Sequence, residues 1–229
     1  MNKIKKTPSL GIILLLNQFS GDLILELIKN INLADLEYEI NNEISTWAIG
    51  LVIKIMREKS LTIARKLAKS IDLDSLSESI RKDTNVWGIC VCFRELLMVD
   101  PRVWISLATK VDFSVLAGKV ENVNATGISR LLEILSIDET VGQRLVTNLD
   151  FDKVANRIDE SSSLFYILNI IENLMKIGDT FGRQLLEKID VEKLATKLNQ
   201  ESKGFRRYAR QMLSQLEGTE KLVRRIKVA

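Results

Sequence analysis

The sequence predicts an all-α chain that folds as a right-handed α-solenoid, and three observations lead to this prediction. A decapeptide pattern recurs five times along the 229 residues, beginning at residues 31, 71, 111, 149 and 189. Each copy has the composition of a helix start. With only 2 prolines and 6% aromatic residues, the chain does not have the composition of a turn-rich β-sandwich. Near-equal spacings of about 40 residues are the sequence signature of a repeat protein.

Each decapeptide carries the pattern of a capped helix. Its second residue is Asn or Asp, which are preferred at a helix N-cap. Aliphatic residues stand just before this cap and four residues after it, which is the spacing of a hydrophobic staple. The caps are Asn32, Asp72, Asp112, Asp150 and Asp190. The pattern therefore predicts a short first helix at the same place in every unit.

Two further helices are expected in each unit. A large apolar residue stands near the start of the second helix in four units, and we expect it in the core; these residues are Trp47, Trp87, Phe165 and Phe205. Apolar residues at steps of three and four then continue both helices. The sequence predicts a single domain over residues 1–229, with repeats at 31–70, 71–110, 111–148, 149–188 and 189–229 after a half-repeat at 1–30.

Three helices in about 40 residues resemble the armadillo/HEAT class of α-solenoids. The fifth unit also resembles repeats of uncharacterised archaeal and bacterial multi-repeat proteins, through Ile189, Asp190, Leu194, Ala195 and Leu198. The resemblance implies a non-catalytic binding scaffold for a protein or peptide.

The sequence argues against most enzyme classes. It contains no histidine, so Ser-His-Asp triads, Cys-His dyads and His-based zinc sites are excluded. It contains no glycine-rich phosphate-binding motif, and the repeated aspartates are explained as helix caps. We therefore expect no enzymatic activity, no cofactor and no metal. The least favoured alternative is a DNA-repair glycosylase, because HEAT-like solenoids include such enzymes.

Cysteine content and hydropathy favour a cytoplasmic protein without a membrane partner. Cys90 and Cys92 are two residues apart in an apolar run, so we expect free, packed thiols. Free thiols suit a reducing compartment. The apolar run at 10–16 is too short to span a bilayer, and it fits the half-repeat better than a signal peptide.

Cationic residues of the predicted third helices form one candidate partner-binding surface. They are Arg65, Lys66, Lys69, Arg102, Arg144 and Arg183. In armadillo-like proteins the third helix lines the concave groove, so the resemblance implies that this ridge faces a ligand. The alternative is an ordinary solvated face.

Trp104 has two interpretations. Its counterparts in the other units are Ala64, Gly142 and Gly182, which are small. A tryptophan at this position either fills a local gap or protrudes as a binding anchor.

The C-terminal segment is strongly basic. Residues 203–229 contain eight cationic side chains, among them Arg206, Arg207 and Arg210, against two acidic ones. The segment is either the polar cap that a solenoid needs at its end or an electrostatic patch for nucleic acid or an acidic protein. Nucleic acid is the second candidate partner. We expect Phe205 and Tyr208 to be buried, which disfavours base stacking and leaves salt-dependent backbone attraction.

Overall fold

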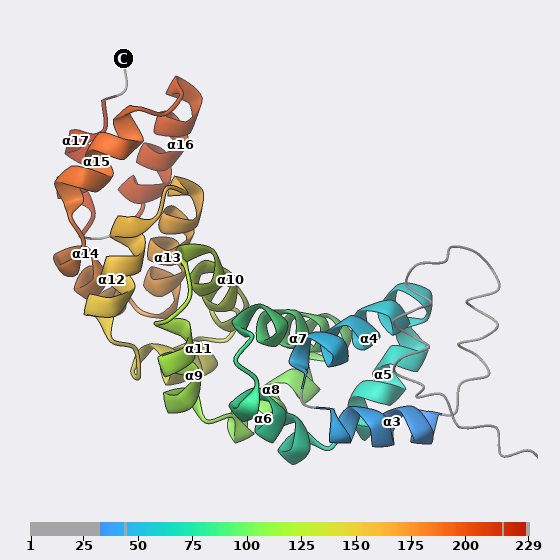
Figure 1. The fold of residues 1–229 in the computed structure, drawn as a ribbon. Helices are drawn as coiled ribbons and strands as arrows, with labels where there is room; N and C mark the ends of the chain where they lie inside the picture. The colour runs from blue at the N-terminus through green and yellow to red at the C-terminus, as the bar shows by residue number, and fades with distance from the viewer. Residues whose placement is uncertain (1–32, 44, 217, 228–229) are drawn as a thin grey trace, which may run out of the picture. The chain divides into compact units, whose positions relative to one another are not determined.

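A computed structural model describes residues 33–43, 45–216 and 218–227, and this part of the chain is helical throughout (Figure 1). It contains fifteen α-helices and no β-strand. The prediction of an all-α protein is therefore confirmed. The predicted half-repeat at 1–30 and the first cap, Asn32, lie outside the described residues.

The helices recur in a fixed order of lengths along the chain. The first helix of each set has 8 to 10 residues, and all five second helices have 11 to 14. The first helices are α3 (Leu33–Asn42), α6 (Leu73–Lys82), α9 (Phe113–Val120), α12 (Phe151–Glu160) and α15 (Val191–Asn199). The second helices are α4 (Thr46–Lys59), α7 (Val86–Val99), α10 (Ala125–Leu135), α13 (Leu164–Ile177) and α16 (Lys203–Ser214). The third helices are α5 (Leu61–Ser70), α8 (Pro101–Lys110), α11 (Glu139–Val146), α14 (Asp179–Lys188) and α17 (Glu220–Arg225).

The repeated aspartates begin the first helices, as their positions predict. The side chains of Asp72, Asp150 and Asp190 each accept a hydrogen bond from a backbone N–H in the first turn. These bonds satisfy donors that have no partner inside a helix. The aliphatic residues on both sides of each cap are buried: Ile71 with Leu76, Val111 with Leu116, Leu149 with Val154 and Ile189 with Leu194.

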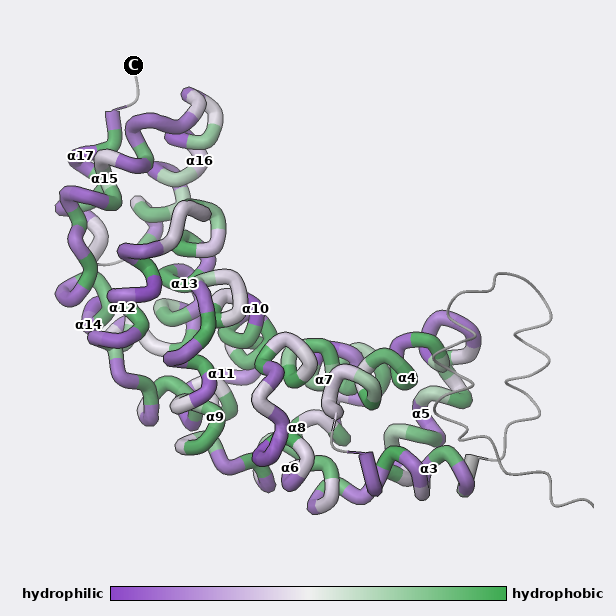
Figure 2. The backbone as a smooth tube through the Cα atoms, viewed as in Figure 1, coloured by the Kyte–Doolittle hydropathy of each residue, from purple (hydrophilic) through white to green (hydrophobic). Residues whose placement is uncertain are grey.

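The chain divides into two compact units, residues 1–112 and 113–229. In the first unit, α4 and α7 pack against each other and form one layer, and Figure 2 shows hydrophobic stretches along both helices. The other layer contains α3, α5, α6 and α8, where α3 contacts α5 and α6 contacts α8. The core between the layers includes Ile53, Met56, Phe93 and Leu96, which are fully buried.

The second unit repeats this layering. Helix α13 contacts α10 on one side and α16 on the other. First and third helices form the second layer, with contacts of α9 with α11, α12 with α14, and α15 with α17. Ile167, Ile171 and Leu174 of α13 are fully buried between them.

The predicted burial of the second-helix aromatics is wrong. Trp47, Trp87 and Phe165 are 43%, 50% and 47% exposed, and Phe205 is only partly buried. The physical reason is helical phase. Trp47 lies two residues before Ile49, a rotation of about 200° around the helix axis, so burial of Ile49 directs Trp47 to solvent.

Candidate interaction surfaces

The most distinctive exposed surface of the first unit is the outer side of α4 and α7. We call it the α4/α7 face, and it consists of Trp47, Leu51, Lys54, Glu58, Trp87, Val91, Arg94 and Met98. None of these side chains is buried, whereas most other residues of both helices are. On each helix they follow steps of four, three and four residues, which is one face of an α-helix.

Two glycines bring α4 and α7 together beneath this face. A Cβ atom at Gly50 would lie 2.7 Å from the backbone N of Cys92, and one at Gly88 would lie 2.8 Å from the backbone N of Trp47. Early residues of α4 thus contact early residues of α7, and later residues contact later ones. The two helices are therefore parallel and closely packed, and Trp47 lies beside the residue that follows Trp87.

A buried carboxylate fixes two arginines at the far end of the same helices. The Glu95 side chain is 1% exposed and accepts bonds from Arg57 Nε at 2.9 Å and from Arg94 Nη2 at 2.9 Å. Each guanidinium binds a different carboxylate oxygen. The Arg94 side chain remains 52% exposed, so it offers a charged group to solvent in a fixed orientation.

Hydrogen bonds at the starts of α4 and α7 fix the tryptophan end of the face. The Asp83 carboxylate accepts bonds from the backbone N–H of Thr46 at 2.8 Å and from its hydroxyl at 2.7 Å. Asn85 caps α7 by accepting a bond from Gly88 N at 3.1 Å. The starts of α4 and α7 are thus fixed relative to each other, and with them the backbones that carry Trp47 and Trp87.

The predicted third-helix ridge is basic in the first unit. Arg65, Lys66 and Lys69 on α5 and Arg102 on α8 are all exposed. Arg65 Nε donates to the backbone oxygen of Val99 at 3.3 Å, and Lys69 Nζ lies 3.9 Å from Asp100. The structure brings these four cations to neighbouring third helices of one unit.

The other two ridge residues belong to the second unit and are partly buried. The guanidinium of Arg144 lies over the ring of Phe113 at 4.8 Å from its centroid, a cation–π contact within the unit. Arg183 packs near Gly218, where a Cβ atom would lie 3.0 Å from Arg183 Cγ.

Trp104 is buried, with 1% of its surface exposed, so its interpretation as a protruding anchor is wrong. It occupies the inward position that Ala64, Gly142 and Gly182 occupy in other sets, and all three are buried as well. The indole N–H has no hydrogen-bond partner among the described residues. Trp104 therefore fills the core of the first unit.

The three C-terminal arginines singled out in the sequence, Arg206, Arg207 and Arg210, are on α16. Arg207 and Arg210 are exposed, whereas Arg206 is partly buried and donates to the backbone oxygen of Asn199 at 2.9 Å. The predicted burial of Tyr208 is wrong, because its side chain is 44% exposed. The buried residues of α16 are Ala209, Met212 and Leu213. The exposed residues of this helix thus include one aromatic ring and two arginines.

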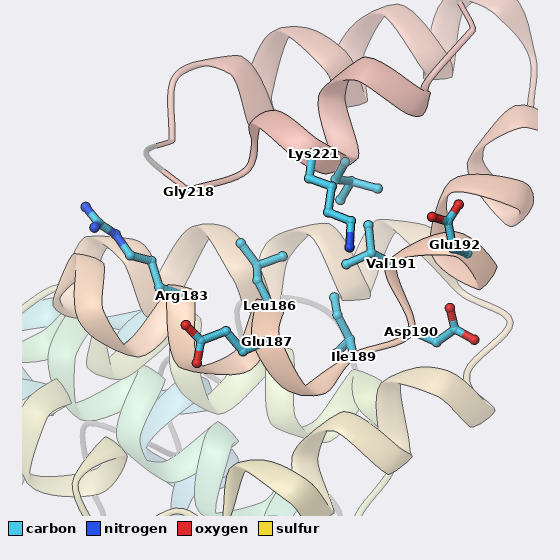
Figure 3. Close-up of a pocket in the computed structure, with 10 residues that line it drawn as sticks. Arg183, Leu186, Glu187, Ile189, Asp190, Val191, Glu192, Gly218 and Lys221 are labelled. Carbon is cyan, nitrogen blue, oxygen red and sulfur yellow. The ribbon is translucent and has the colours of Figure 1, made fainter.

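A shallow pocket of about 500 Å³ lies between α14, the start of α15 and the turn before α17 (Figure 3). Its aliphatic floor includes Leu186 and Ile189, and its charged lining includes both Arg183 and Glu187. Cations and carboxylates are mixed here, so the pocket has no single electrostatic preference. Its geometry favours no particular ligand.

The described part of the chain has few sites where side chains could bind a metal ion or act as a nucleophile. It has no cluster of three or more His, Cys, Asp or Glu residues that would hold a metal ion. No described helix is both long enough and apolar enough to cross a membrane. Cys90 and Cys92 are buried and form no disulfide, and burial raises the pKa of the Cys92 thiol to about 12. A thiol with such a pKa stays protonated and poorly nucleophilic at neutral pH.

Sequence reasoning missed the α4/α7 face, although a helical wheel shows it. Trp47, Leu51 and Lys54 share one side of the wheel, opposite Ile49, Ile53 and Met56.

No protein-family model, curated protein or solved structure shows significant similarity to the chain. The exposed surfaces of the two units therefore carry the functional argument.

Proposed function

We propose that the chain is a non-catalytic helical-repeat scaffold that binds a protein or peptide. In this proposal its three-helix sets are five repeats of a right-handed, armadillo/HEAT-like α-solenoid, following a half-repeat at 1–30. The recurring helix boundaries, the repeated caps and the two-layer packing within each unit support the repeat architecture. Two cysteines that form no disulfide favour a cytoplasmic location.

The observation that carries the proposal is the exposed pair Trp47 and Trp87. Tryptophan is a costly residue to leave in water, and it is enriched among the residues that dominate binding energy. Here two tryptophans recur at the second position of adjacent, tightly packed helices. Leu51 and Val91 add apolar surface about one turn beyond them. An exposed apolar patch of this kind is typical of an interaction site.

Selection from a random 16-residue peptide display library tests this proposal. We expect peptides enriched on the wild-type chain to bind at least tenfold more weakly to Trp47→Ala and Trp87→Ala, because anchor residues contribute about 2 kcal/mol or more. Tyr38→Ala is the matched control, since Tyr38 is an exposed aromatic on α3. If enriched peptides bind all three variants equally well, the α4/α7 face is not the contact surface.

Single-stranded nucleic acid is a second candidate ligand, favoured by the exposure of Tyr208, Arg207 and Arg210 on α16. Bases stack on exposed aromatic rings, and arginines attract the phosphate backbone. We expect weak, salt-dependent binding of a poly(dT) oligonucleotide that Arg207→Glu/Arg210→Glu abolishes. Arg206 stays unchanged in this variant because it bonds to the Asn199 backbone. Absence of binding at low salt would assign α16 to a polar cap.

A further inference from the structure

The chemistry of the α4/α7 face changes in the same order along both helices. Trp47 and Trp87 come first, Leu51 and Val91 follow four residues later, and Lys54 and Arg94 follow after three more. Because α4 and α7 are parallel, side chains of like kind lie on neighbouring helices at each of these three levels. Seven helical residues span about 10 Å, so the cations lie about two turns beyond the tryptophans.

Positive charge exceeds negative charge at the cationic level. Arg57 and Arg94 share a single carboxylate, that of Glu95. The charge of Lys54 is offset by Glu58, whose carboxylate lies 3.8 Å from Lys54 Nζ. One positive charge therefore remains, and the exposed guanidinium that presents it is Arg94.

We infer that the α4/α7 face binds an amphipathic helical segment of a partner protein that carries two apolar side chains followed by a carboxylate. This inference rests on the proposed function and specifies the ligand class. The apolar side chains contact Trp47 and Trp87 and the aliphatic level beside them. The carboxylate pairs with Arg94, with Lys54 nearby.

The spacing of the levels favours a helical ligand. A helix that lies along α4 and α7 presents its own side chains at i, i+4 and i+7 with the same axial spacing as the three levels of the face. Glu95 holds the Arg94 guanidinium in place, so pairing with a ligand carboxylate costs little side-chain ordering.

The peptides selected on the wild-type chain also test this inference. We expect the enriched sequences to contain two apolar residues three or four positions apart and an acidic residue about seven positions from one of them. Synthetic twins that carry Glu or Gln at the acidic position are then titrated against the wild type, Lys54→Gln and Arg94→Gln. Lys176→Gln is the matched control, because Lys176 is an exposed cation of α13 that lies outside the face and pairs with Glu172 as Lys54 pairs with Glu58.

On the wild type, the Glu peptide should bind about tenfold more tightly than its Gln twin, as expected for a charge-assisted hydrogen bond. Arg94→Gln should remove most of this preference, Lys54→Gln should reduce it, and Lys176→Gln should leave it unchanged. Circular dichroism of each variant separates misfolding from lost binding, and Lys54→Gln leaves the Glu95 pairs intact.

Suppose that peptide binding depends on the tryptophans and yet shows no preference for Glu over Gln, or the same preference in all variants. Either result would overturn this inference and leave the proposed function standing. Peptides that do not depend on the tryptophans would overturn both.

Discussion

Trp104 and Trp87 show how position within a helix decides the role of one residue type. Trp104 is 1% exposed, whereas Trp87 is 50% exposed. Trp104 stands where other sets have alanine or glycine. Small residues let neighbouring helices pack closely, whereas here the indole fills the space between them. Trp87 lies on the opposite side of its helix from the core residue Ile89. Neither location follows from the size or hydrophobicity of tryptophan alone.

We therefore expect Trp104→Ala to lower the free energy of unfolding by about 3–5 kcal/mol, since it leaves a large cavity. Trp104→Phe should cost much less, because it keeps most of the volume and removes an indole N–H that lacks a partner. Urea unfolding followed by circular dichroism at 222 nm measures both values. Equal losses for the two variants would mean that cavity volume does not dominate at this site.

The Cys92 thiol provides a chemical test of core packing. Its pKa is raised to about 12 by burial, with a smaller contribution from the nearby Asp83 carboxylate. Deprotonation is therefore negligible at pH 8, and reagents also lack access to the sulfur. We expect iodoacetamide at pH 8 to label Cys92 slowly in the native protein and rapidly in 8 M urea. Mass spectrometry gives the extent of labelling, and fast native labelling would contradict the packing of α7.

At the scale of single elements, the contact between α4 and α7 depends on glycine. A Cβ atom at Gly50 would approach the backbone of Cys92 to 2.7 Å, and backbone atoms have little freedom to move away. Gly118 of α9 is a contrasting position, because no atom lies within 4 Å of a Cβ built there. The same residue type thus permits close helix packing at one site and has open space around it at the other.

Gly50→Ala should destabilise the protein by about 1–3 kcal/mol through overpacking. Gly118→Ala should stabilise it by about 0.5–1 kcal/mol, because alanine is the better helix former. Thermal unfolding of the two variants beside the wild type checks the signs. A destabilisation of equal size at both positions would point to a general effect of helix glycines rather than to close packing.

The N-termini of the helices were the most predictable feature of the fold. Asp72, Asp150 and Asp190 mark helix N-termini in the sequence, and each caps a helix in the structure. A cap needs only local information, because the side chain bonds to the backbone two or three residues ahead. The buried stripe of α16 was less predictable, since the exposure of Tyr208 depends on which neighbouring helices cover it.

At the scale of the whole chain, the period of about 40 residues predicted the all-helical class and the placement of the helices. It did not predict the candidate site. The cationic ridge was chosen by resemblance and charge, and its members are divided between the two units, with Arg144 and Arg183 partly buried. The α4/α7 face requires two further facts. One is helical phase, which the sequence contains, and the other is the close parallel packing of two helices, which depends on three-dimensional contacts.

The central claim is that a ligand contacts Trp47 and Trp87, and the indole N–H signals of the ¹⁵N-labelled protein test it most directly. The chain has three tryptophans, and only Trp104 is buried. Single Trp→Phe variants assign the three signals. Titration with a peptide selected on the wild-type chain should shift the signals of Trp47 and Trp87 and leave that of Trp104 in place. Saturable binding that moves neither exposed indole signal would contradict the account.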